Sequence, residues 1–139
     1  MDLAFKAAGD GIWLIGNVGT HLGQSLWLRE CHGREDGPPP PVDLAAERAH
    51  GEQVAALIAA GTVNAVHDLS DGGLAVALAE MAMAGGLGAT VEVPLTAATA
   101  FGEDQGRYLI TAPADVAIAG ATRIGTVGGP EGLGALVLN

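Results

Sequence analysis

The residues best suited to chemistry lie in one run, 67–74, which reads His-Asp-Leu-Ser-Asp-Gly-Gly-Leu. A short β-prone stretch precedes this run and a helical pattern follows it, so we expect a strand, a tight turn and the start of a helix. Free N–H groups and the helix dipole attract anions at such a turn, and neighbouring carboxylates suit Mg²⁺. The candidate phosphate contacts here are Ser70, Gly72 and Gly73, and the candidate metal ligands are Asp68 and Asp71.

The same run also has a purely structural interpretation. Ser70 or Asp71 would cap the helix, the two glycines would serve the turn, and His67 would be a hydrogen-bonded core histidine. Because helix caps far outnumber phosphate sites in proteins, the chemistry of this run taken alone favours the structural interpretation.

Two further polar segments, 19–25 and 101–107, have residue types that suit a ligand site. In the later segment, Glu103 and Asp104 are candidate cation ligands, and Arg107 carries a guanidinium fork that matches a carboxylate or a phosphate. In the earlier one, Gly23 and Ser25 suit a loop near a ligand. Each segment taken singly is equally an ordinary polar turn, with a surface ion pair of little energetic value in the later one.

Other common catalytic motifs are missing from the sequence. It contains no Walker-type phosphate loop, no nucleophile elbow, no dinucleotide fingerprint and no paired metal-binding histidines. The corresponding chemistries can be set aside.

The elements that must position these residues follow from hydrophobic periodicity. The apolar run 12–15 between two glycines predicts a buried strand, and the proline-rich stretch 33–41 predicts an exposed loop. Asp43 is a candidate N-cap for a helix that ends near Gly61, with Leu44, Val54, Leu57 and Ile58 at near-helical spacing.

The second half of the chain alternates short β-rich runs with one clear helix. The helix is predicted over 72–84, with Leu74, Leu78, Met81 and Ala82 on one face. The further predicted strands are 63–67, 90–93, 107–111, 122–127 and 133–138. We find no internal repeat and no second domain boundary, so we interpret residues 1–139 as one domain.

Composition narrows the class of protein. Of 139 residues, 49% are hydrophobic, which is enough for one core without metal or disulfide staples. A formal charge of −10 repels phosphate backbones and anionic lipids, so we expect no binding to nucleic acid or membrane, although a Mg²⁺-bridged nucleotide remains compatible. A single cysteine, Cys31, and no apolar run of about 18 residues predict a soluble, cytoplasmic protein.

Taken together, four segments resemble a known family. They are Leu-Gly-Gln-Ser at 22–25, His-Asp-Leu-Ser-Asp-Gly-Gly-Leu at 67–74, Gly-Glu-Asp-Gln-Gly-Arg-Tyr at 102–108 and Arg-Ile-Gly-Thr-Val-Gly-Gly at 123–129. Their order resembles the second C-terminal-type domain of phosphoribosylformylglycinamidine synthase subunit II. That type of domain is shared with aminoimidazole ribonucleotide synthetase, selenophosphate synthetase, thiamine monophosphate kinase and a hydrogenase-maturation protein.

The resemblance implies a fold and a reaction. The fold is an α/β (α+β) domain with three α/β/α layers and a mixed, partly ferredoxin-like sheet. The reaction is that of a carbon–nitrogen ligase, which uses ATP, Mg²⁺ and glutamine to convert formylglycinamide ribonucleotide to the amidine in purine biosynthesis. A glutaminase and small accessory subunits are the implied partners. The N-terminal-type domains that hold the catalytic histidine are absent, so no catalytic residue carries over and the isolated domain is expected to be inactive.

The resemblance also implies site residues. In the first copy of this domain the equivalent turn carries a metal-binding Asp and a later segment binds substrate, and here Asp68 and residues 103–105, including Gln105, occupy the pseudosymmetric places. Such a second copy can hold a structural nucleotide or nothing. The family also leads us to expect longer connections at 93–101 and 114–121, the latter with a full helix. Two alternatives stay open: a docking module without ligand contacts, and the same domain of a related synthetase or kinase.

Overall fold

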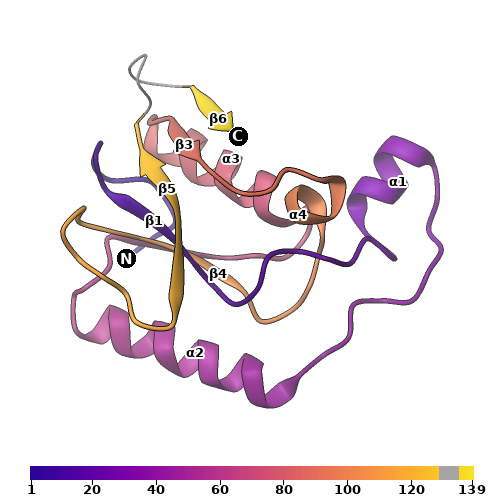
Figure 1. Ribbon diagram of the computed structural model, residues 1–139, viewed down its shortest axis with the longest axis horizontal. Coiled ribbons are helices and arrows are strands. Elements are labelled where there is room, and N and C mark those ends of the chain that lie inside the picture. Colours follow the sequence, from indigo (N-terminus) through magenta and orange to yellow (C-terminus); the bar gives the residue numbers. More distant parts are fainter. Residues whose placement is uncertain (129–134) are drawn as a thin grey trace.

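A six-stranded mixed sheet forms the centre of the protein (Figure 1). The computed structural model describes residues 1–128 and 135–139. The elements run in the order β1 (Gly11–Ile15), α1 (Leu26–His32), α2 (Leu44–Ala59), β2 (Ala65–Asp68), α3 (Gly73–Gly85), β3 (Ala89–Val91), α4 (Ala97–Phe101), β4 (Tyr108–Ala112), β5 (Ala121–Val127) and β6 (Leu136–Leu138). The strand order is β2-β4-β1-β5-β3-β6, and only β3 and β6 pair in parallel.

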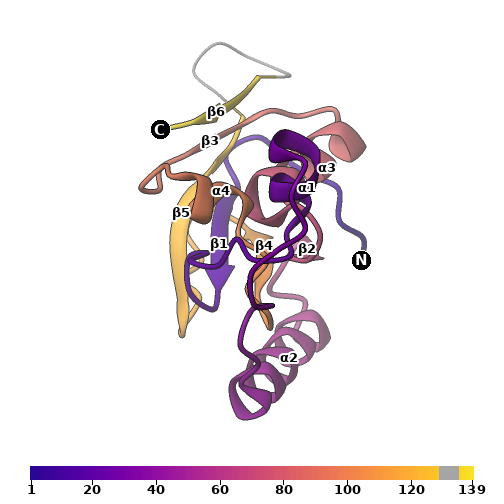
Figure 2. The same ribbon diagram turned by 90° about the vertical axis from the view of Figure 1, so that its right-hand side faces the viewer.

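Helices cover both faces of the sheet (Figures 1 and 2). Successive side chains of a strand point to opposite faces, and β1 follows this rule. Ile12 and Leu14 pack in one buried cluster with Leu78 of α3, whereas Ile15 packs in another with Val54 of α2. The three-layer α/β/α arrangement with a mixed sheet is therefore confirmed.

The predicted strands and the two long helices are present, with ends displaced by a few residues. Asp43 caps α2 as expected, and its carboxylate accepts hydrogen bonds from two backbone N–H groups of the first turn. The apolar stripe of α2 is narrower than predicted, because Leu44 and Ile58 are exposed and Val54 is its buried residue. Of the last predicted strand, Leu133 and Gly134 lie outside the described residues.

Two short helices were not predicted. α1 has seven residues and α4 has five, too few for hydrophobic periodicity to reveal either. Their caps are regular: the side chain of Ser25 accepts from Leu28 N, and Thr96 and Thr99 form a capping box.

Two of the predicted loops have simple structures. The proline-rich loop, 33–41, is almost wholly exposed, as predicted. The full helix expected at 114–121 is wrong, because the connection from β4 to β5 contains no helix. Ile118 of this connection packs in the buried cluster beneath α2. In the described part of the chain, no helix is long and apolar enough to cross a membrane.

The turn between β2 and α3 depends on Gly73, whose φ is +68° and whose added Cβ would lie 2.5 Å from the carbonyl oxygen of Gly102. Gly73→Ala should therefore lower the free energy of unfolding by about 3 kcal/mol, from left-handed strain plus a backbone clash. Gly33 has a similar φ of +60° with nothing within 4 Å, so Gly33→Ala should cost only about 1 kcal/mol. Urea unfolding of both variants measures the difference, and equal losses would contradict the close approach.

Candidate functional site

The three polar loops predicted to form a site meet at one end of the sheet. Their meeting point is the carboxylate of Glu103, whose Oε1 accepts hydrogen bonds from the backbone N–H groups of Leu26 at 2.9 Å and Gly72 at 2.8 Å. Leu26 begins α1, and Gly72 is the N-cap residue of α3. One side chain thus ties the loop before α1 and the turn before α3 to the segment before β4.

Asp104 fastens the first loop a second time. Its carboxylate accepts from Thr20 N at 3.0 Å, Thr20 Oγ1 at 2.8 Å and His21 N at 3.1 Å. Burial acts to raise the pKa of Asp104, but these hydrogen bonds and the positive charge of Arg107 outweigh burial, so the pKa lies below its ordinary value. The carboxylate is therefore held in its ionised form.

Arg107 is buried, with 3% of its surface exposed. Its Nε donates to the carbonyl of Asp104 at 2.8 Å, and one terminal nitrogen donates to the carbonyl of Gly102 at 2.6 Å. Burial lowers the pKa of the guanidinium, and the nearby Asp104 charge opposes that effect. The surface ion pair considered from sequence is not what forms here, because Arg107 holds its own loop in shape from inside.

The turn at 67–74 leaves β2 and enters α3, as predicted. Gly72 and Gly73 both have left-handed backbone conformations, and no side chain of the turn itself caps α3, so capping by Ser70 or Asp71 is not observed. His67 lies between two carboxylates, with Nε2 2.7 Å from Glu80 and Nδ1 3.4 Å from Asp68. His67 is thus a hydrogen-bonded histidine with 13% of its side chain exposed, close to the structural interpretation of this run.

The candidate metal ligands are not gathered into a metal centre. Across residues 1–128 and 135–139, no three His, Cys, Asp or Glu side chains are grouped so that they could hold an ion. Asp68 and Asp71 are exposed in the turn, while Glu103 is occupied by two backbone N–H groups. A role of these three residues in binding a metal stays a prediction that requires ligands from elsewhere.

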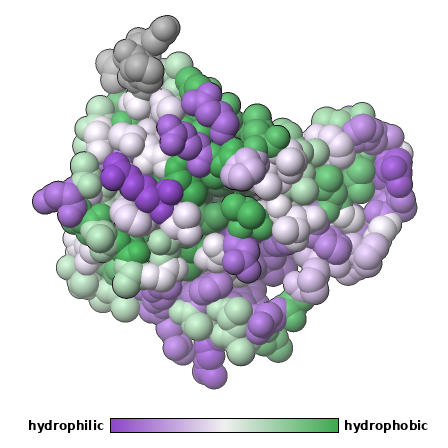
Figure 3. Space-filling model, in the orientation of Figure 1, coloured by the Kyte–Doolittle hydropathy of each residue, from purple (hydrophilic) through white to green (hydrophobic). Residues whose placement is uncertain are grey.

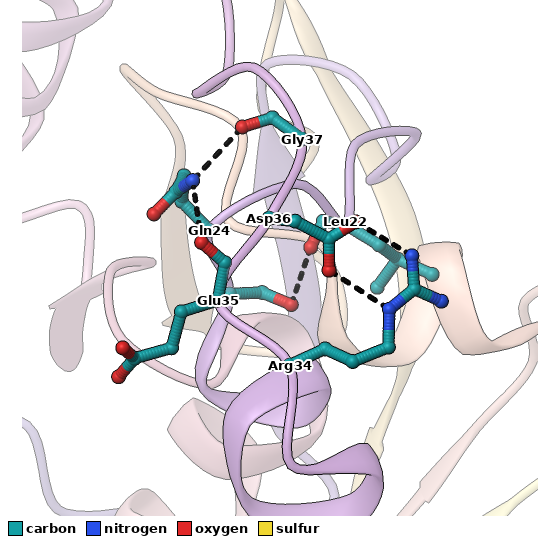
Figure 4. A network of polar contacts seen from close by, with 7 residues as sticks. Leu22, Gln24, Arg34, Glu35, Asp36 and Gly37 are labelled. Carbon is teal, nitrogen blue, oxygen red and sulfur yellow. Dashed lines mark hydrogen bonds and ion pairs between the residues drawn. The ribbon is translucent and has the colours of Figure 1, made fainter.

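The loop at 19–25 is also bound to the proline-rich loop (Figure 4). The side-chain amide of Gln24 donates to the carbonyls of Glu35 and Gly37, each at 2.9 Å, and an added Cβ on Gly23 would lie 2.1 Å from the carbonyl of Pro38. Ser25 is buried and caps α1 while its Oγ donates to Leu22 O. Gly23 and Ser25 thus have structural partners within the chain.

Two adjoining hollows border the converging loops. The first, of about 250 Å³, lies between the start of α2 and residues 16–20, and the second, of about 130 Å³, is bordered by Asp68, Ser70 and Gln105. Glu47 lines both hollows, and so do Gln105 and Arg107. Among the candidate site residues, Asp68, Ser70 and Gln105 are exposed and border this shared surface, whose charged residues are mostly acidic.

Sequence reasoning missed the contribution of α2 to this surface. Glu47 lines both hollows and His50 lines the first, with its Nδ1 2.7 Å from the carbonyl of Gly106. These residues belong to no motif, and 56 positions separate His50 from Gly106. Only helical spacing, which puts Glu47 and His50 on one side of α2, offered a signal.

The mixed sheet, the layers and the converging loops define a class of domain. Residues 7–135 match the model of the AIR synthase related protein, C-terminal domain, and the chain belongs to that family. Among curated relatives, it is 64% identical over 129 residues to "Phosphoribosylformylglycinamidine synthase subunit PurL" of Novosphingobium aromaticivorans, covering 93% of this chain. It is 53% identical over 150 residues to the protein of that name from Zymomonas mobilis, covering 99% of this chain.

The chain spans only 18% and 20% of the lengths of these two relatives. The alignment with the Novosphingobium protein is 129 positions long, and 93% of the 139 residues of this chain is also 129 residues. The relative therefore has no inserted residues within the aligned stretch. The short connections at 93–101 and 114–121 are therefore shared with that relative.

Solved structures have the same fold. "T. maritima PurL complexed with FGAR" superimposes with a TM-score of 0.71 at 21% identity, covering 92% of this chain and 25% of that one. Hydrogenase maturation protein HypE in complex with ATP gives 0.65 at 21%, covering 99% and 49%. Thiamine monophosphate kinase from Aquifex aeolicus gives 0.63 at 21%, covering 100% and 53%.

Removing the Glu103 carboxylate should loosen two loops at once. Glu103→Ala leaves the N–H groups of Leu26 and Gly72 without their acceptor, so we expect a loss of about 2 kcal/mol in the free energy of unfolding. Glu103→Gln keeps a neutral acceptor and should lose about half as much. Glu52→Ala, which removes an exposed ion pair with Arg48, is the matched control and should change little. Equal effects of Glu103→Ala and Glu52→Ala in urea unfolding would refute this clamp.

The lowered pKa of Asp104 predicts a pH-dependent contribution to stability. A carboxyl group with a depressed folded pKa stabilises above its unfolded value, about 3.9, and loses that effect as pH falls through the folded pKa. Asp104→Asn should therefore be about 1 kcal/mol less stable at pH 7, with the difference shrinking below pH 4. Chemical unfolding at both pH values measures it, and Asp115→Asn, at an exposed position, should show no such trend. A difference that persists unchanged at low pH would count against the ionised carboxylate.

Proposed function

We propose that the chain acts as the C-terminal-type domain of a phosphoribosylformylglycinamidine synthase. The complete enzyme would be a carbon–nitrogen ligase that converts formylglycinamide ribonucleotide to the amidine with ATP and glutamine. The observation that carries the proposal is 64% identity, without insertion, to a relative named for that activity. Because this chain spans 18% of that relative, the activity belongs to a longer assembly in which this domain takes part.

Within that assembly the domain supplies a pre-shaped polar surface. Glu103 and Asp104 hold the loops through hydrogen bonds to backbone N–H groups, and Arg107 does so with Nε and one terminal nitrogen, while its buried Nη1 has no partner among the described residues. Asp68, Ser70 and Gln105 are exposed at the rim of the smaller hollow. Such fixed polar groups can orient a ribonucleotide or nucleotide that other domains bind more fully. Rigid loops reduce the entropy that binding would otherwise lose.

The proposal includes ATP and Mg²⁺ as ligands of the complete enzyme. This chain alone does not fit a Mg²⁺ ion, since its described residues offer no group of three suitable ligands. Asp68 and Asp71 can contribute carboxylate oxygens only to an ion held by further groups. Neighbours of the same fold have been solved with ATP, which supports a nucleotide in proteins of this class.

The partners we propose are the N-terminal-type domains, a glutaminase and small accessory subunits, in the cytoplasm. A neighbour of this fold belongs to a T. maritima complex named PurLQS, which supports an assembly of several proteins. The exposed, unpaired thiol of Cys31 is compatible with a reducing compartment.

A second candidate function is a docking module that touches no ligand. It is favoured by the internal use of the polar groups: Glu103, Asp104, Arg107 and Ser25 all hydrogen-bond within the chain. For the alternative of a related kinase, thiamine monophosphate kinase is a neighbour in fold alone.

Titration calorimetry of the 139-residue chain with formylglycinamide ribonucleotide and with Mg-ATP separates the two candidates. We expect weak binding of one of them, with a Kd on the order of 1 mM because most of the site lies in other domains. Asp68→Ala should weaken that binding at least tenfold, whereas Asp115→Ala, at an exposed position remote in the fold, should not. Flat titrations with both ligands would favour the docking module.

A further inference from the structure

A band of hydrophobic side chains runs along the β6 edge of the sheet. Figure 3 shows hydrophobic surface around β6 and between that strand and the lobe formed by α1. Met83 and Leu95 are 75% and 53% exposed, and Leu136 and Leu138 are only partly buried beside the core. The hydrophobic band consists of Trp27, Met83, Leu87, Leu95, Leu136 and Leu138.

β6 is an exposed edge of the sheet. It is the outermost strand in the sheet order, and no other described strand pairs with its outer side. Natural edge strands are usually protected by short length, charges, prolines or bulges, and this three-residue strand, Leu-Val-Leu, has short length but neither a charge nor a proline. Its exposed backbone groups and apolar side chains are suited to contact with another polypeptide.

The outer face of α3 forms one end of the hydrophobic band. Glu80 is the only charged residue of this helix, and its carboxylate is bound to His67. A helix that is hydrophobic on all sides is normally buried on all sides. Here a shallow hollow of about 330 Å³ separates Met83 and Leu87 from Leu136, and almost all of its lining is apolar.

Trp27 forms the other end of the band. Its ring stacks on Phe101 with centroids 6.3 Å apart and planes at 16°, and none of the residues of α1 is buried. A hollow of about 390 Å³ lies between Trp27, Leu95 and Leu138. A partly exposed tryptophan beside an apolar hollow is typical of an interface centre. α1 begins at the Glu103 clamp, so the band is continuous with the candidate site.

We propose that the hydrophobic band is the surface on which a neighbouring domain of the same, longer ligase chain docks. The inference rests on the proposed function, because relatives named for that activity are about five times longer than this chain. A second copy of this chain is disfavoured as the occupant, since two surfaces of a protein with a formal charge of −10 repel each other. The docking segment should therefore present apolar side chains flanked by basic ones.

Methionine oxidation tests the proposal directly. This chain is placed in the Novosphingobium relative in exchange for the matching segment, and hydrogen peroxide oxidation of Met83 is followed by mass spectrometry in the chimera and in the isolated chain. We expect Met83 to react at least tenfold more slowly in the chimera. Met81, with 0% exposure, should be protected in both and is the internal control. Equal rates for Met83 in the two proteins would overturn the docking surface.

Variants separate docking from folding. Leu95→Lys in the chimera should restore most of the Met83 reactivity, whereas Leu44→Lys, at a still more exposed site on α2, should leave Met83 protected. Both should leave the Tm of the isolated chain within about 2 °C, because the side chains are exposed. Light scattering that shows a dimer of the isolated chain, abolished by Leu95→Lys, would overturn the choice of occupant.

The chimera also distinguishes this proposal from the proposed function. ATP-dependent formation of the amidine by the chimera, with ammonia supplied in place of the glutaminase, supports the proposed function whatever happens at Met83. Activity with a fully reactive Met83 overturns only the docking surface. A protected Met83 without any activity overturns the proposed function and leaves the docking surface supported.

Discussion

The Glu103 carboxylate supplies the hydrogen-bond acceptor on which the loop end of this domain depends. The N–H groups at the starts of α1 and α3 have no partner within their own helices, and one oxygen of Glu103 accepts from both Leu26 and Gly72. A negative charge at the positive ends of two helices is also favoured by their dipoles. This shared acceptor links α1 to α3, and the apolar contact of α1 is made at its surface, where Trp27 stacks on Phe101, because none of its residues is buried.

The same arrangement explains how an acidic loop cluster can be rigid. Asp104 and Glu103 point their charges at backbone N–H groups, and the guanidinium of Arg107 binds the carbonyls of the loop that carries them. Charges that would repel each other in an open loop are thus paired with local dipoles. The polar side chains left at the surface, such as Asp68 and Gln105, then extend from a fixed frame.

The two ends of the molecule differ in what they offer. The loop end presents oxygen-rich groups over shallow hollows, and the β6 edge presents leucine, methionine and tryptophan side chains. α1 joins the two, because its start is clamped by Glu103 and its Trp27 packs on Phe101. A partner bound at the apolar edge would contact α1, and the start of α1 is also held by the loop end through Glu103. Because no residue of α1 is buried, a shift of this helix would change the geometry of the loops.

The sequence by itself determined the elements whose information is local. Hydrophobic periodicity and caps predicted β1, α2 and α3, and the glycines at 72 and 73 marked the turn before α3, because spacing and backbone freedom are properties of neighbouring residues. α1 and α4 are too short to show a period, and Leu44 fits the helical spacing of α2 although it faces solvent. Only the tertiary structure decided what Glu103, Asp104 and Arg107 do. The partners of the two carboxylates lie 31 to 84 positions away in the chain, so no local pattern reveals them. Arginine is usually exposed, and the burial of Arg107 follows from the packing of the whole loop.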